Sequence, residues 1–121
     1  MLRKHATVKW HVYRRLEGRE QGGRRPVLVV SSDRINRRPL VVTVIPGTDG
    51  RDIETNYPSN VRVPAPESGL PLETVFLGFQ IRSLDPSRFA DPRSGDIHLA
   101  GRLSSSRMQE VDEALRRVLA L

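Results

Sequence analysis

Cysteine is absent from this chain of 121 residues. Without a thiol there can be no disulfide framework, no thiolate zinc site and no cysteine nucleophile. Long hydrophobic runs are missing as well, because the longest, Val27 to Val30 and Leu40 to Ile45, are far shorter than the roughly 20 residues that cross a bilayer. The first residues also lack the apolar stretch of a secretion signal. We therefore expect a cytoplasmic protein that makes no contact with a membrane.

Lysine is scarce, since 18 of the 20 cationic side chains are arginine. The net charge of +6 is uneven: residues 1–38 hold 11 cationic and 3 acidic side chains, net +8, and the remainder hold 9 and 11, net −2. A guanidinium pairs with phosphate through two hydrogen bonds, so this composition favours a nucleic-acid partner. Ordinary solvated arginines from biased codon usage are the alternative. The length and the 37% hydrophobic content predict a single domain over residues 1–121.

Short β-type segments recur along the chain. Apolar and polar residues alternate from Thr7 to Tyr13, which predicts a half-buried strand. Further strands are predicted at residues 27–31, 40–45, 60–63, 74–79 and 97–103. Arg14 to Arg25 is rich in glycine and arginine and predicts a cationic loop, while the turn formers from Pro46 to Gly50 predict that the strand stops at Ile45 and that an exposed loop runs to Ser59. The pattern predicts a mostly β chain that forms a small barrel.

Helical signals are few. A helical turn is predicted at residues 32–38, and a short helix at 84–89 with Asp85 as N-cap and Pro86 at its first position. The clearest helix is the last, where Ser106 and Gln109 fit a capping box. Its apolar stripe either covers the sheet, which we favour, or forms a surface for another protein. The stripe consists of Met108, Val111, Leu115, Val118 and Leu119.

An ordered series of short motifs runs along nearly the whole chain. A glycine-bearing loop ends in an Arg-Pro pair that opens an apolar strand, and a Pro-x-Thr motif closes the next strand. The motifs lie at residues 20–31 with Asp33 and Asn36, at 46–48, at 69–70, at 80–85 and at 101–103. Taken in this order they resemble the MazF/PemK toxins. The resemblance implies a small SH3-like (MazF/CcdB-type) β-barrel with a C-terminal helix.

The resemblance also implies a function. It indicates a sequence-specific, metal-independent endoribonuclease toxin (an mRNA interferase) of a type II toxin–antitoxin system, which cleaves single-stranded RNA. Proteins of this family form symmetric homodimers and are silenced by an antitoxin whose acidic tail lies in the RNA groove. The net charge of +8 in residues 1–38 suits both partners. We therefore expect Arg14, Arg15, Arg19 and Arg24 to contact RNA and antitoxin alike.

RNA cleavage without a metal uses the ribose 2′-hydroxyl as nucleophile and leaves a 2′,3′-cyclic phosphate and a 5′-hydroxyl. The enzyme has to move protons and stabilise a crowded phosphorane. By resemblance, Arg25 is the acid/base and charge-stabilising group and Thr48 donates its hydroxyl to the scissile phosphate. Only charge stabilisation follows from the guanidinium itself, because a pKa above about 12 makes arginine a poor base. The alternatives are a surface ion pair of Arg25 with Glu17 or Glu20, and a Thr48 hydroxyl bonded to its own backbone.

Four more residues are expected to bind substrate. They are Glu20, Arg24, Gln80 and Arg82. Glu20 either orients Arg25 or accepts a proton, or is a solvated loop side chain. Arg82 either lines the RNA groove or forms an ion pair at a strand end.

Three departures from the family pattern are visible. Ala6-Thr7 stands where the family has Gly-Asp, residues 90–96 form an insertion, and Asp49 replaces the Ser or Thr that follows the family threonine. A carboxylate beside a phosphate site repels substrate, so we expect Asp49 to affect activity or its pH dependence. The three histidines have neither metal-ligand spacing nor a paired arrangement, and we expect no cofactor and no histidine mechanism.

Two other functions fit the same composition. The barrel is shared by CcdB-type toxins that trap a DNA gyrase, although the Arg-Pro and Pro-x-Thr motifs count against that interpretation. A non-catalytic basic barrel that binds RNA or DNA is the second alternative, and it predicts binding that weakens steeply with salt while the RNA stays intact. Cleavage of unstructured RNA distinguishes the nuclease from both.

Overall fold

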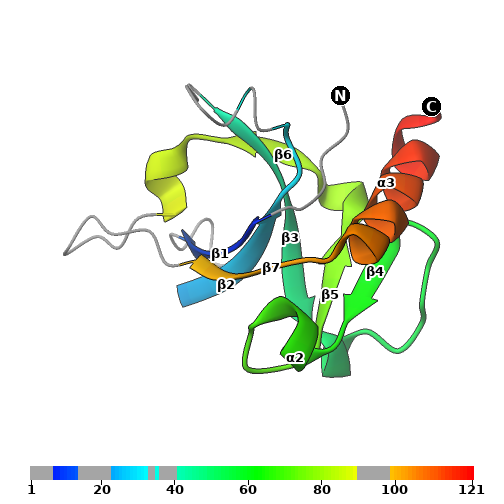
Figure 1. Cartoon of the computed structure of the whole chain (residues 1–121), viewed down its shortest axis with the longest axis horizontal. Helices are drawn as coiled ribbons and strands as arrows, with labels where there is room; N and C mark the ends of the chain where they lie inside the picture. Colours follow the sequence, from blue (N-terminus) through cyan, green and yellow to red (C-terminus); the bar gives the residue numbers. More distant parts are fainter. Residues whose placement is uncertain (1–6, 14–22, 33–34, 36–40, 90–98) are drawn as a thin grey trace.

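A single antiparallel sheet dominates the computed structural model, which describes residues 7–13, 23–32, 35, 41–89 and 99–121 (Figure 1). The strands are β1 (Thr7–Tyr13), β2 (Gly23–Val29), β3 (Val42–Asp49), β4 (Asn60–Val63), β5 (Thr74–Leu77), β6 (Arg82–Leu84) and β7 (Leu99–Arg102). Their order across the sheet is β4-β5-β3-β2-β1-β7, and β6 pairs separately with β3.

Strand β3 joins the two halves of this sheet. Its first half lies between β2 and β6, with Val44 opposite Val29 on one side and opposite Arg82 on the other. From Gly47 onward β3 pairs instead with β5, where Gly47 is opposite Phe76. One continuous strand therefore carries the chain from one half of the molecule to the other.

The sheet of the described residues is open, since its end strands β4 and β7 are not paired with each other. Helix α3 (Ser105–Leu119) packs over β4 and over the 3₁₀ turn η2 (Gly78–Gln80), and the short helix α2 (Ala65–Ser68) packs against β7. The expectation of a mostly β chain with a C-terminal helix is confirmed, whereas the barrel is a curved sheet that does not close. None of the described helices is long and apolar enough to span a membrane.

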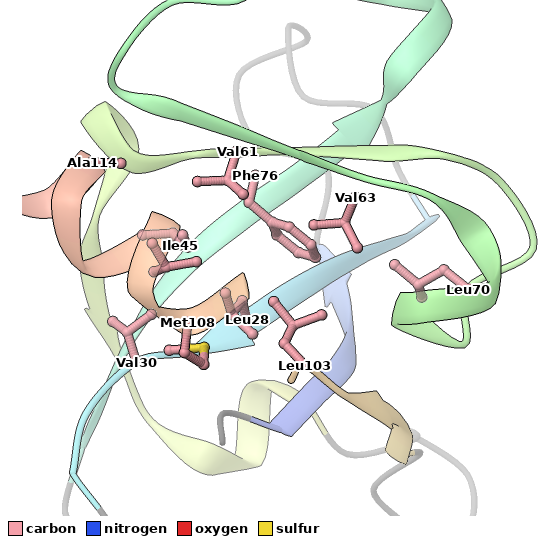
Figure 2. Packing of buried hydrophobic residues seen from close by; sticks show 11 residues of the cluster. Leu28, Val30, Ile45, Val61, Val63, Leu70, Phe76, Leu103, Met108 and Ala114 are labelled. Carbon is pink, nitrogen blue, oxygen red and sulfur yellow. The ribbon is translucent and has the colours of Figure 1, made fainter. Parts of the chain in front are cut away.

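The main core lies between the sheet and α3 (Figure 2). Phe76 is completely buried at its centre, and Met108 of α3 packs from the other side with 1% of its surface exposed. Burying each such side chain contributes about 1.5–3 kcal/mol. The cluster comprises Leu28, Val30, Ile45, Val61, Val63, Leu70, Phe76, Leu103, Met108, Val111 and Ala114.

A smaller cluster occupies the opposite face of β2 and β3. It contains Val27, Val29, Val42 and Val44, with Leu84 of β6 packed against them. Because side chains alternate between the two faces of a strand, neighbouring residues of β2 and β3 go to different clusters. Both faces of this strand pair are therefore apolar in the middle. This agrees with the continuous apolar runs in the sequences of β2 and β3.

The predicted turn from Pro46 to Gly50 is wrong, because β3 continues to Asp49. Pro46 is the last residue of β3 that is paired with β2, and the pairing with β5 begins at the next residue. The missing backbone donor of proline disturbs the hydrogen bonds between strands least at such a change of partner. Gly47 is needed for packing: a Cβ atom there would lie 2.6 Å from the Thr74 Cγ2 atom and 3.1 Å from the Phe76 ring. Turn-forming residues thus serve here as strand residues.

Two other expected boundaries are also wrong. Strand β2 begins at Gly23, so Arg25 belongs to a strand and lies opposite His11 of β1. Local composition suggested a loop because it could not show the pairing that β1 supplies. Helix α3 is capped by Ser104, whose Oγ accepts a hydrogen bond from the Arg107 backbone N at 3.2 Å, and not by Ser106.

Several predictions are confirmed. Strands were expected at 7–13 and 60–63 with the observed bounds, and the edge strand near residue 100 is β7. Asp85 precedes the 3₁₀ turn η3 (Pro86–Phe89) and its carboxylate accepts from the Ser87 backbone N at 2.9 Å, which lowers the pKa of Asp85. The insertion at 90–96 lies outside the described residues, as does most of the turn expected at 32–38.

Helix α3 is tied to α2 by ion pairs as well as by apolar contacts. Arg107 donates from Nε and Nη2 to the two carboxylate oxygens of Glu67, at 2.7 and 2.9 Å, and also pairs with Glu110 of its own helix. These hydrogen bonds lower the pKa of Glu67 and raise the pKa of Arg107. The link fixes the start of α3 over the α2 end of the sheet.

Candidate functional site

The ends of β2 and β3 bring Arg25 and Thr48 to the same side of the sheet. Val27 lies opposite Pro46 in the antiparallel ladder. Arg25 precedes Val27 by two residues and Thr48 follows Pro46 by two residues. Since side chains two apart on a strand point to the same face, both extend the face that carries Val27.

A pocket of about 300 Å³ lies at this place, and both side chains line it. Arg25 and Thr48 are each partly buried, so they are held by the protein and still reach solvent. The two residues that the sequence assigned to catalysis therefore share one cavity. The pocket is lined by Arg25, Pro26, Gly47, Thr48, Asp49, Asp52, Leu70, Pro71, Leu72 and Thr74.

The third wall of the pocket, residues 70–74, is positioned by the end of α2. Gly69 closes that helix with a positive φ of 78°, and a Cβ atom there would lie 2.2 Å from the Ala100 carbonyl oxygen. A Cβ at Gly101 would in turn lie 2.4 Å from the Ser68 carbonyl oxygen. The 69–70 and 101–103 motifs are thus in direct contact. Their glycines let β7 approach α2, and Leu70 follows directly as a buried pocket residue.

Charged groups at the end of β3 form a compact pair. Arg51 donates from Nη2 to Asp49 Oδ2 at 2.6 Å and from Nε to both carboxylate oxygens at 3.1 and 3.2 Å. The Arg51 backbone N also donates to Asp49 Oδ1 at 2.9 Å, which caps the 3₁₀ turn η1 (Gly50–Asp52). These hydrogen bonds lower the pKa of Asp49 and raise the pKa of Arg51. The carboxylate beside Thr48 is therefore ionised and bound to a cation.

Arg62 of β4 holds the loop that follows Thr48. Its Nη1 donates to the Gly50 carbonyl oxygen at 3.0 Å and to Glu73 Oε1 at 2.8 Å, and its Nε donates to Asn56 Oδ1 at 2.9 Å. A further hydrogen bond runs from Nη2 to the Ile53 carbonyl oxygen. One guanidinium thus connects β4, the residue before β5 and the loop at 50–56. These contacts hold in place the loop that follows Thr48 at the edge of the pocket.

The structure does not bring Gln80 and Arg82 to this pocket. Gln80 ends η2 and Arg82 begins β6, where the Arg82 Nη2 atom lies 3.5 Å from Gln80 Oε1. Arg82 is opposite Val44, four residues before Thr48, which is about 13 Å along a strand. Their predicted contact with RNA therefore requires a substrate that extends along β3 beyond the pocket.

The remaining predicted contacts fall on parts of the chain that are not described. Glu20 lies outside the described residues together with Arg14, Arg15 and Arg19. Arg24 belongs to β2, but its side chain is likewise outside the description. Their roles stay predictions.

Several pocket residues were not anticipated from the sequence. Asp52 and the apolar wall of Pro71 and Leu72 were missed, as was the pairing of Arg51 with Asp49. The segment Asp49-Gly50-Arg51-Asp52 contains a recognisable signal, since an Asp side chain often accepts from the backbone N two residues later. Among the described residues, no three His, Asp or Glu side chains are grouped so that they could hold a metal ion.

Comparison with known proteins agrees with the motifs and the fold. The family model of PemK-like, MazF-like toxins of type II toxin–antitoxin systems matches residues 8–119. The chain is 34% identical over 104 residues to the endoribonuclease EndoA of Bacillus subtilis strain 168, covering 86% of this chain and 83% of that protein. It is 35% identical over 106 residues to the endoribonuclease MazF of Staphylococcus epidermidis, covering 88% and 82% respectively.

Solved structures show the same arrangement of elements. The MazE–MazF complex (Form II) from Deinococcus radiodurans contains a chain with a TM-score of 0.69 and 29% sequence identity, covering 95% of this chain and 93% of that chain. The family match spans β1 to the end of α3 and thus includes both strands that build the pocket. This chain is a member of the PemK-like, MazF-like family of toxins of type II toxin–antitoxin systems.

Proposed function

We propose that the protein is an endoribonuclease toxin that cleaves single-stranded RNA at the pocket between β2 and β3. The proposal is supported by the family and by the two relatives that are named endoribonucleases. The observation that carries it is the convergence of Arg25 and Thr48 on one cavity, although they are 23 positions apart in the sequence. A phosphate placed in this cavity meets a guanidinium and a hydroxyl together.

The proposed chemistry is attack by the ribose 2′-hydroxyl on the adjacent phosphorus, with release of a 5′-hydroxyl and a 2′,3′-cyclic phosphate. The Arg25 guanidinium stabilises the negative charge that grows on the phosphorane, and the Thr48 hydroxyl donates to a phosphate oxygen. Both groups are partly buried, and an electrostatic interaction is stronger there than in bulk water. The proton transfers are assigned to Arg25 by family resemblance.

The family also defines the expected partners. A toxin of a type II system has an antitoxin, and we propose that an acidic segment of this antitoxin binds the arginine-rich N-terminal third, where residues 1–38 are net +8. We further propose that the toxin acts as a homodimer in the cytoplasm, where its mRNA substrates are found.

The test is cleavage of a pool of unstructured RNAs by purified protein in EDTA, followed by chemical analysis of the fragment ends. We expect 5′-hydroxyl and cyclic phosphate ends. Arg25→Ala and Thr48→Ala should each lower the rate by about 10²-fold or more, which is the usual cost of losing one preorganised donor. Both variants should keep the melting temperature of the wild type.

Arg116→Ala is the matched control, because Arg116 is an exposed arginine of α3 that pairs with Glu113 and does not line the pocket. This variant should cleave at the wild-type rate. Intact RNA with every substrate would reject the nuclease proposal. Toxicity that survives Arg25→Ala and Thr48→Ala would favour gyrase trapping, and salt-sensitive binding without cleavage would favour a non-catalytic RNA-binding protein.

A further inference from the structure

The described residues that line the proposed RNA pocket carry more negative than positive charge. Among the described residues that line it, Arg25 is the single cation, while Asp49 and Asp52 are both carboxylates. The lining is therefore net negative, although the ligand is a phosphodiester that is itself an anion. A cation close to this described lining would lower its repulsion of a phosphate.

Arg51 is placed to do so. It does not line the pocket, but its guanidinium contacts both oxygens of Asp49, the closest contact being 2.6 Å. Of the two side chains, Arg51 is 78% exposed and Asp49 only 24% exposed. The cation therefore covers the carboxylate from the solvent side. Asp52 lies near enough to Arg51 to raise the pKa of the guanidinium further.

We propose that Arg51 is a positioning residue of the RNA site, which neutralises the Asp49 carboxylate and so lowers its repulsion of the substrate phosphate. With Arg51 in place, the two carboxylates of the described lining are matched by the guanidinium groups of Arg25 and Arg51, and the repulsion between Asp49 and RNA is lowered. This inference rests on the proposed function. It explains how the chain tolerates a carboxylate directly after Thr48, where the family usually has a hydroxyl.

The loop geometry supports a fixed pair rather than a chance surface contact. Asp49 accepts from the Arg51 backbone as well as from its side chain, so the turn itself orients the carboxylate. Arg62 holds the same loop through the Gly50 and Ile53 carbonyl oxygens. Asp49 and Arg51 both lie on this anchored segment. The backbone therefore keeps the carboxylate and the guanidinium close to each other.

The test compares Arg51→Gln, Asp49→Asn and the double variant Asp49→Asn/Arg51→Gln in steady-state cleavage of an RNA that the wild type cuts. Arg51→Gln exposes an unneutralised carboxylate and should raise KM by about three- to tenfold with little change in kcat. The double variant should return KM to within about twofold of the wild type, since the repelling charge is gone. Arg51→Lys keeps the charge and should restore most of the affinity.

Arg116→Gln is the control for net charge, because it also removes one exposed arginine from an ion pair, that with Glu113. It should leave KM unchanged. The defect of Arg51→Gln should also shrink between about 0.1 M and 1 M salt, as the Debye length falls from roughly 10 Å to 3 Å.

Three results would overturn the inference. A double variant that stays as weak as Arg51→Gln would mean that Arg51 contacts the RNA directly. A fall in kcat at constant KM would mean that the pair only shapes the loop around Thr48. An equal loss in Arg116→Gln would reduce the effect to overall charge. Each of these needs a wild type that cuts RNA, so they differ from failure of the proposed function, in which the wild type itself leaves RNA intact.

Discussion

The two faces of the β2–β3 strand pair are built from alternating residues of the same segments, yet they differ in what they contact. Leu28 and Ile45 point into the large cluster beneath α3. Val27 and Val44 point the other way into a small cluster, and the same face continues to Arg25 and Thr48 at the pocket. One face packs into the main core, while the other is apolar in the middle and leads to the candidate site at one end.

This difference shows how a small domain can hold the two side chains of a candidate site in place. The catalytic candidates need no separate scaffold, because each lies two residues from a fully or nearly fully buried one. Their backbone positions are set by the opposite face, whose side chains pack against α3. Changes on the core face should therefore alter the stability of the whole fold, and changes to the Arg25 and Thr48 side chains should alter RNA cleavage alone.

The largest expected effect on stability is at the centre of the main core, into which this face points. Phe76→Ala removes a completely buried ring and should lower the free energy of unfolding by about 3–5 kcal/mol. Phe79→Ala is the matched control, since Phe79 is 57% exposed, and it should change stability by less than about 0.5 kcal/mol. Urea denaturation measures both. Similar losses of unfolding free energy in the two variants would contradict the placement of Phe76 at the centre of the core.

The next largest effect tests the close packing between β3 and β5 at Gly47. Gly47→Ala places a methyl group 2.6 Å from Thr74 Cγ2 and should cost about 1–3 kcal/mol through overpacking. Thr74→Ser removes that Cγ2 atom, so it should recover part of the loss in the Gly47→Ala background while destabilising the wild type. A thermal-unfolding double-mutant cycle measures this coupling. Strictly additive effects would mean that Gly47 is not a packing residue.

A smaller effect distinguishes the two possible caps of α3. Ser104→Ala should cost about 1 kcal/mol, because it removes the oxygen that accepts from the Arg107 backbone N. Ser106→Ala should change the unfolding free energy by less than about 0.5 kcal/mol. If Ser106→Ala were the more harmful substitution, the capping box read from the sequence would be right and the structural cap wrong.

The smallest effect concerns acid sensitivity where α3 meets α2. Arg107 lowers the pKa of Glu67, so the pair stabilises the folded state above the ordinary Glu pKa and loses this contribution as the pH falls through the lowered value. Between about pH 5 and pH 2, the melting temperature of Glu67→Gln should fall less steeply than that of the wild type. Arg107→Gln should behave in the same way. Parallel curves for all three proteins would show that the exposed pair is too weakly coupled to matter.

Much of the fold could be predicted because apolar periodicity is a local property of the chain. The bounds of β1 and β4, the Asp85 cap and the existence of the last helix were all read from neighbouring residues. The errors occurred where a local signal had a nonlocal cause. Pro46 and Gly47 are turn formers by composition, but Pro46 is placed in β3 by its pairing with β2, and Gly47 by its pairing with β5 and its packing on the Phe76 ring.

The candidate site divides in the same manner. The Arg-Pro and Pro-x-Thr motifs pointed to Arg25 and Thr48, because those residues belong to short ordered patterns. The closing wall at Pro71 and Leu72 and the neutralising contact of Arg51 could not be read in this way. Both features depend on which segments of the chain fold against each other. Gln80 and Arg82 are the opposite case, because they belong to a matched motif but do not lie at the pocket.

By itself, the amino-acid sequence determined the family, the mostly β character and the two side chains assigned to chemistry, because periodicity and ordered motifs are properties of neighbouring residues. Tertiary structure alone decided that β3 runs through Pro46 to Asp49, that the described strands form an open sheet, and that Arg51 covers the carboxylate beside Thr48. These outcomes depend on backbone pairing and close packing between distant segments, and the free energies of such contacts are not visible in any one stretch of the chain.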